Sequence, residues 1–121
     1  MFYIFISGLQ GNQAKVEEFA IQVLNHYFGN RIKRIIDIEI RFVKHLKGTL
    51  GYCWGDPDHV IIEIAKQDGN GNKFTKAEMM ETLAHELVHA KQHIRKDKRK
   101  PQLTEAEAYG IEEQLFKLYW N

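Results

Sequence analysis

The segment from Thr75 to Ile94 constrains the fold most, because it predicts one long helix that carries two histidines on the same face. Thr75 and Glu78 have the spacing of a capping box, in which paired side chains satisfy free N–H groups at the start of a helix. Apolar residues then recur at helical spacing, namely Met79, Met80, Leu83, Leu87, Val88 and Ile94. His85 and His89 stand one helical turn apart, so their Cβ atoms are expected about 6 Å from each other on one face.

The motif His85-Glu86-Leu87-Val88-His89 is an HExxH pattern, and inside a helix it predicts a zinc site. Two imidazoles on one helix face can bind one tetrahedral zinc ion at about 2.0–2.1 Å. Glu86 lies about 100° further round the helix. From there its carboxylate can take a proton from a water molecule at the metal. Leu87 and Val88 are expected to face the core and anchor the helix.

A catalytic zinc ion needs a third protein ligand and one open position. His93 shares a face with His85 but lies two helical turns away, so the three histidines cannot surround one ion. Cys53 could bind zinc, but it lies in a turn-rich segment. The remaining candidates are Glu105 and Glu107, two carboxylates at the start of the last predicted helix.

The predicted start of that last helix, at Thr104, favours one of these two carboxylates. Thr104 and Glu107 have the spacing of a second capping box, in which Glu107 bonds back to the backbone of Thr104. Glu105 lies on a stripe that can face the histidine-bearing helix, and the stripe also holds Ala108, Tyr109, Glu112, Phe116 and Tyr119. We therefore favour Glu105 over Glu107 as the third zinc ligand.

The HExxH motif followed by Glu105-Ala106-Glu107-Ala108-Tyr109 resembles the gluzincin group of zinc metallopeptidases. In that group the third ligand is a glutamate on a following helix, often within a Glu-x-x-Ala pattern, and the resemblance places it at Glu105. Tyr109 stands where an aspartate often supports a ligating histidine. The small size resembles minimal gluzincins and the compact ImmA/IrrE-like or SprT-like domains of bacteria and phages, so a bacterial, archaeal or phage origin is expected.

The resemblance implies a small metalloendopeptidase that hydrolyses peptide bonds in peptide or protein substrates. Zinc would be held by His85, His89 and Glu105, and Glu86 would move the proton from water to the leaving amine. An additional donor to the oxyanion is expected, for which Tyr109 and His59 are candidates.

The rest of the chain predicts one α+β domain that spans residues 1–121. A small zincin-like domain is expected, in which a mixed sheet of three to four strands packs against an N-terminal helix and the HExxH helix, with a C-terminal helix after them. Asn12 is expected to cap the N-terminal helix. The predicted strands are a buried one at 2–6, one with a solvent-facing side at 36–42, a short one at 52–54 and one at 59–65.

The strand at 59–65 precedes the zinc helix, and in zincins the strand at this place runs along the edge of the cleft. By this resemblance its free edge would bind an extended peptide by β-strand addition. The alternative for the same residues is an ordinary central strand.

Segment 91–100 suggests a second function class, because it holds six basic residues and one acidic residue in a chain whose net charge is +1. Cations are favoured at the end of a helix, which accounts for part of this run. The alternative is a zincin-like module that binds nucleic acid or an acidic protein through Lys91 to Lys100, with proteolysis secondary or absent.

The composition bears on disulfide bonds, membrane spans and the cellular compartment of the chain. Cys53 is the single cysteine, which excludes an internal disulfide and a cysteine-based zinc cage. No apolar run reaches the roughly 20 residues of a membrane span, so no membrane partner is expected. These features predict a cytoplasmic protein.

Overall fold

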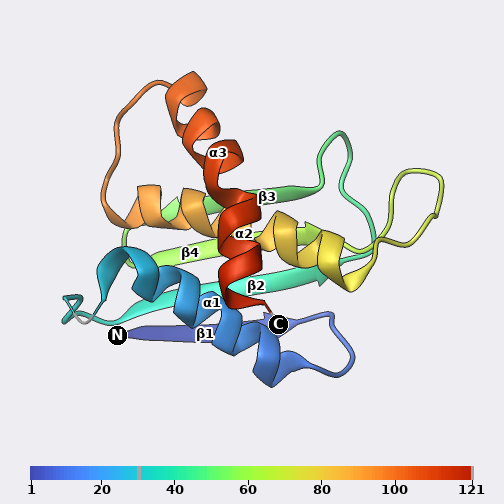
Figure 1. The fold of residues 1–121 in the computed structure, drawn as a ribbon, viewed down its shortest axis with the longest axis horizontal. Coiled ribbons are helices and arrows are strands. Elements are labelled where there is room, and N and C mark those ends of the chain that lie inside the picture. The colour runs from blue at the N-terminus through green and yellow to red at the C-terminus, as the bar shows by residue number, and fades with distance from the viewer. Residues whose placement is uncertain (30, 121) are drawn as a thin grey trace.

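The computed structural model describes residues 1–29 and 31–120, and it confirms an α+β fold with a four-stranded mixed sheet (Figure 1). The elements follow in the order β1 (Phe2–Ser7), α1 (Gln13–Phe28), β2 (Ile36–Val43), β3 (Gly51–Asp56), β4 (His59–Ala65), α2 (Lys76–Ile94) and α3 (Pro101–Tyr119). None of the helices in the described part of the chain is both long and apolar enough to cross a membrane.

The strand order across the sheet is β1-β2-β4-β3. β1, β2 and β4 run parallel, while β3 and β4 form an antiparallel hairpin that turns at Pro57 and Asp58. Residues of β2 alternate between buried and partly exposed, with Ile36, Ile38 and Ile40 fully inside. This confirms the prediction of a strand with one side toward solvent.

Two predictions about strands are wrong, and the strand order gives the reason for each. β1 is an edge strand rather than a buried one, and Tyr3 and Phe5 lie on the face of the sheet opposite the core, so they are 45% and 55% exposed. Residues 59–65 form β4, which lies between β2 and β3 and has no free edge, so the alternative of an ordinary central strand is confirmed. The free edge on that side of the sheet belongs to β3, because the hairpin folds β3 outside β4.

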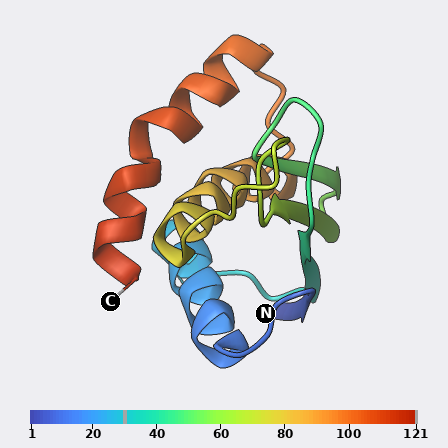
Figure 2. The same ribbon diagram turned by 90° about the vertical axis from the view of Figure 1, so that its right-hand side faces the viewer.

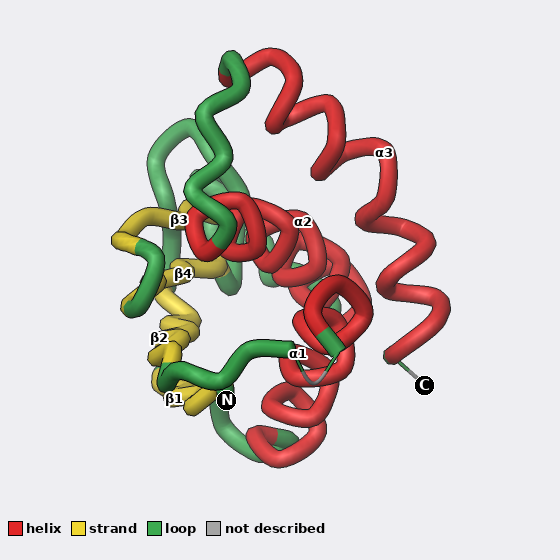
Figure 3. Tube along the Cα trace, turned by 90° about the vertical axis from the view of Figure 1, so that its left-hand side faces the viewer, coloured by secondary structure: helices red, strands yellow, loops and turns green. Residues whose placement is uncertain are grey.

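All three helices lie on one face of the sheet, in two successive layers. Figures 2 and 3 show α1 and α2 against the strands and α3 on the far side of these two helices. The core lies between the sheet and the first helical layer, and its largest fully buried side chains are Phe19, Leu24, Ile36, Ile38, Ile40, Ile62, Ile64, Met80, Leu83 and Leu87, together with Leu115 from α3. Leu87 and Val88 are completely buried, as predicted, and fix the face that α2 turns outward.

The three helices begin differently. α2 begins with the predicted capping box, in which the Thr75 hydroxyl accepts from the Glu78 N–H and the Glu78 carboxylate accepts from the Thr75 N–H. Asn12 does precede α1, but its side chain makes no capping hydrogen bond. The predicted start of the last helix at Thr104 is wrong. α3 already begins at Pro101, because proline suits the first turn of a helix, and the capping box with Glu107 does not form.

Candidate metal centre

A cavity of about 810 Å³ lies between β3, α2 and α3, and the HExxH residues form part of its wall. His85, Glu86 and His89 line it from α2, while residues Gly48 to Cys53 line it from β3 and the preceding loop. Glu105 and Glu112 line it from α3. The predicted ligands and the predicted base therefore share one cavity.

His85, His89 and Glu105 come together as a group that could hold a metal ion. The Nε2 atoms of His85 and His89 lie 2.9 Å and 2.7 Å from the same oxygen, Oε1 of Glu105. One ligand atom from each of the three residues lies within 4.8 Å of the others. His85 is buried, His89 is half-buried and Glu105 is exposed, so the group is reachable from solvent.

The second nitrogen of each imidazole also faces an oxygen. Nδ1 of His85 lies 3.2 Å from Oε1 of Glu112, and Nδ1 of His89 lies 2.7 Å from Oε1 of Gln92. A neutral imidazole has only one N–H, so it cannot donate to acceptors on both sides. If each ring donates its N–H to the oxygen at Nδ1, the two Nε2 lone pairs and Glu105 are left to bind a cation. Both rings thus have the environment that orients zinc-bound histidines.

Glu86 is the most deeply placed carboxylate of the cavity, with 6% of its surface exposed. Burial raises its pKa to about 7, an effect that nearby His85 and His89 oppose. Oε2 of Glu86 lies against the backbone of Gly51 at the start of β3, because a Cβ atom built on Gly51 would be only 2.9 Å from it. A metal ion beside the histidines would favour the ionised carboxylate, which is the form that accepts a proton.

The two candidate third ligands lie in different places, although they are two residues apart. Glu105 points to both histidines, and its pKa is lowered because its contacts with His89 and His85 outweigh the opposing effect of burial. Glu107 points away from the metal group and contacts Lys91, Gln92 and Arg99. The structural role predicted for Glu107 at a capping box is therefore wrong, and side chains of α2 and of the following loop replace the backbone of Thr104 as its partners.

Of the two candidate oxyanion donors, Tyr109 lies at the cavity and His59 does not. Tyr109 lines the cavity, and its ring centre lies 4.5 Å from that of His85. His59 pairs with Glu39 at 2.6 Å on the sheet and does not line the cavity. His93 and Cys53 do line the cavity, but neither belongs to the metal-binding group.

Three residues of the site were missed in the sequence. Glu112 occupies the supporting position beside His85, where the resemblance pointed to Tyr109. Its position two helical turns after Glu105, on the same stripe, was a signal for this role. Gln92 follows His89 by three residues, a spacing that lets it reach the ring. Gly51 gave no signal, because its contact with Glu86 depends on how β3 passes α2.

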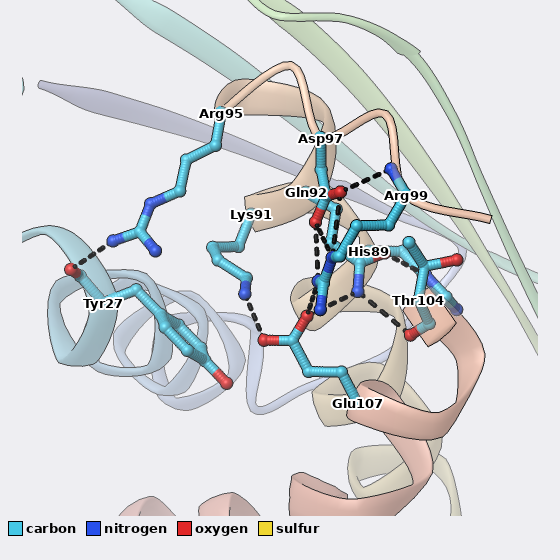
Figure 4. Close-up of polar contacts among 9 residues, drawn as sticks. All are labelled: Tyr27, His89, Lys91, Gln92, Arg95, Asp97, Arg99, Thr104 and Glu107. Atoms are coloured by element: carbon cyan, nitrogen blue, oxygen red, sulfur yellow. Dashed lines mark hydrogen bonds and ion pairs between the residues drawn. The ribbon is translucent and has the colours of Figure 1, made fainter. Parts of the chain in front are cut away.

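The basic segment 91–100 is only partly free for a partner. Lys91 is buried and pairs with Glu107, and Arg99 pairs with Asp97 and Glu107 at 2.6 Å and 2.5 Å (Figure 4). Arg95 donates to the backbone oxygen of Tyr27. Three of the six basic side chains thus connect elements of the chain to each other.

No protein-family model, curated protein or solved structure matches this chain. The function therefore has to be inferred from the geometry of the site.

Proposed function

We propose that this chain is a zinc-dependent peptidase of the gluzincin type. One observation carries the proposal: two histidines one helical turn apart share the oxygen of a glutamate from a second helix, and a buried carboxylate stands between them in sequence. A site that only binds metal has no need of a general base beside its ligands, whereas a hydrolytic site does.

The donor set fits zinc better than calcium or magnesium. His85 and His89 offer imidazole nitrogens, whereas calcium and magnesium prefer oxygen ligands throughout. Three protein ligands would leave one position open, as in catalytic rather than structural zinc sites. When bound, zinc would polarise the substrate carbonyl and make water a stronger nucleophile.

Glu86 would carry the proton in the reaction. Its carboxylate accepts a proton from the water as the water oxygen attacks the peptide carbonyl carbon. The C–N bond then breaks, and Glu86 returns the proton to the leaving nitrogen. Burial raises the pKa of Glu86 in the metal-free protein, and a cation beside the histidines would lower it, which keeps the carboxylate in the form that accepts the proton.

The edge of β3 would hold the substrate. β3 pairs with β4 on one side only, and its residues Gly51 to Cys53 line the cavity beside Glu86. Backbone groups on the other side of β3 can pair with an extended peptide by β-strand addition. Such a peptide would pass between β3 and the metal group, which favours peptide or protein substrates.

The test compares wild type with Glu86→Gln for zinc content and for cleavage of a broad library of unstructured peptides. Glutamine preserves size but does not accept a proton at neutral pH. We expect one zinc per chain in both proteins and cleavage by wild type alone. Equal cleavage by both proteins would refute the role of Glu86, and a wild type that holds zinc but cleaves no peptide would refute the peptidase.

Binding of nucleic acid or an acidic protein through Lys91 to Lys100 remains a prediction. The pairing of Lys91 and Arg99 within the chain gives it no added support. Salt-sensitive binding of DNA would be its signature.

A further inference from the structure

The amide group of Gln92 has a fixed orientation. Its nitrogen donates to the backbone oxygen of Thr104 at 3.0 Å and to Oε1 of Glu107 at 2.9 Å. Turning the amide by 180° would place its oxygen against these two acceptors and lose both hydrogen bonds. The carbonyl oxygen of Gln92 therefore points to Nδ1 of His89, at 2.7 Å (Figure 4).

This orientation of the Gln92 amide selects one tautomer of the His89 ring. Because an oxygen faces Nδ1, the ring nitrogen there must carry the proton and donate it. Nε2, on the side of Glu105, is then the nitrogen whose lone pair is available for a metal. Gln92 thus both turns the ring and determines which nitrogen can bind.

Glu107 in turn holds Gln92 and is itself held from two sides. Lys91 from α2 pairs with Oε2 of Glu107, while Arg99 from the loop pairs with Oε1, the same oxygen that accepts from Gln92. Asp97 fixes Arg99 by a second ion pair at 2.6 Å. The result is a continuous row of contacts from the loop through Glu107 and Gln92 to His89.

We propose that Glu107 is a positioning residue for the metal ligand His89, and that it acts through the side-chain amide of Gln92. The inference rests on the proposed metal site but not on peptidase activity. By this proposal Glu107 changes metal affinity although it is not a ligand. It does so through two hydrogen bonds, from Gln92 to Glu107 and from His89 to Gln92.

A simpler role for Glu107 would be to join α3 to α2 by its ion pairs with Lys91 and Arg99. The two roles differ in one measurable respect. If Glu107 acts through Gln92, its removal has no further effect on metal affinity once Gln92 is gone. If it only joins the helices, the two effects add, because they arise from separate contacts.

The experiment is a double-mutant cycle of Gln92→Met and Glu107→Ala, read out as zinc affinity in a competition titration with a chromophoric chelator. We expect Gln92→Met to weaken zinc binding roughly 10- to 100-fold and Glu107→Ala about tenfold. In the Gln92→Met background, Glu107→Ala should change the affinity less than about twofold. The matched control is Glu113→Ala, which removes an exposed ion pair with Lys117 from the same helix and should leave zinc affinity unchanged.

A spectroscopic measurement separates positioning from general damage. In the zinc-loaded wild type, the Nδ1–H proton of His89 should give a downfield NMR signal that exchanges slowly with water, because Gln92 accepts it. The signal should move upfield and exchange faster in Gln92→Met, while that of His85, which faces Glu112, should stay in place. If Glu107→Ala does not fold, the cycle is run with Lys91→Met in every protein, so that no buried cation lacks a partner.

Additive effects in the cycle, or unchanged zinc affinity in Glu107→Ala, would overturn the proposal even if the enzyme cleaves peptides. Coupled effects and the loss of the His89 signal would support it even if the chain cleaves none. A wild type that binds no zinc would overturn it together with the metal site.

Discussion

Gly51→Ala would test the contact between the edge strand and the proposed base without removing any functional group. A Cβ atom at position 51 would lie 2.9 Å from Oε2 and 3.0 Å from Cγ of Glu86, and 2.8 Å from Cγ2 of Thr82. Ordinary contacts begin near 3.4 Å, so the carboxylate and the strand must separate by about 0.5 Å. The nearest atom of Glu86 is the end of a flexible side chain that lines the cavity, so the carboxylate is expected to take up most of this shift.

The expected loss follows from this displacement. Misplacing a catalytic group by about 1 Å costs roughly 100-fold in rate, so a shift of half that size should lower kcat/KM about tenfold. Stability should fall by about 1 kcal/mol, near the lower end for an overpacked site, because an edge strand can move outward. Zinc affinity should stay the same, since none of the three atoms nearest to an added Cβ belongs to His85, His89 or Glu105.

The assays are kcat/KM on a cleaved peptide, thermal unfolding and zinc titration. Adding Thr82→Ser removes the Cγ2 contact, and it should restore part of the stability but not the activity. The control is Gly110→Ala on α3, where an added Cβ meets nothing within 4 Å, and helix propensity should raise stability by about 0.5–1 kcal/mol. If Gly51→Ala keeps both its activity and its melting temperature, β3 does not press on Glu86 and the reasoning is wrong.

Three further results are expected. In protein with free zinc at about 1,000 times Kd, removal of the zinc with a chelator should lower the melting temperature by about 10 to 20 °C. An unchanged melting temperature would argue against a metal site that joins α2 and α3. Glu105→Ala should lose zinc affinity by orders of magnitude, whereas Glu113→Ala should keep it in the same titration. Burial opposes ionisation of Glu107, but its contacts with Lys91, Gln92 and Arg99 together hold its pKa at about 2, below the ordinary 4.5. Since the folded pKa is the lower one, this contribution to stability is complete above about pH 4.5 and is lost as the pH falls toward 2. Urea unfolding of metal-free wild type and Glu107→Gln should therefore differ at pH 6 and converge near pH 2.

The positions of the candidate site residues along each helix could be predicted from the sequence, whereas most contacts between different helices and strands could not. His85, Glu86 and His89 follow from the period of α2, and the capping box at Thr75 gave the start of that helix to within one residue. Glu105 followed from a stripe on α3. The position of each residue on its own helix needs only local geometry, which the spacing of residues determines, whereas the meeting of Glu105 with the histidines also depends on how α3 packs against α2.

The wrong predictions concern contacts between distant elements. Thr104 and Glu107 have the residue types and spacing of a capping box, but the helix begins one turn earlier, at Pro101. The Glu107 carboxylate instead contacts Lys91, Gln92 and Arg99. The strand order also could not be derived from periodicity. Apolar and polar residues can alternate both in a strand of a hairpin and in a strand with a parallel neighbour, so the alternation does not reveal which strands pair. Only the pairing of β4 with β2 places β3 at the edge of the sheet.

The attachment of α3 connects the metal site with the stability of the domain. Ala108 and Leu115 are the fully buried residues of α3, and Ile111, Phe116 and Tyr119 pack against the core while partly exposed. Its carboxylates Glu105, Glu107 and Glu112 contact the histidines of α2, or the Lys91–Gln92 pair beside them. These polar contacts add to the apolar contacts of α3 in holding the helix in place. A zinc ion held by His85, His89 and Glu105 would join the same two helices, so its binding should stabilise the docked position of α3.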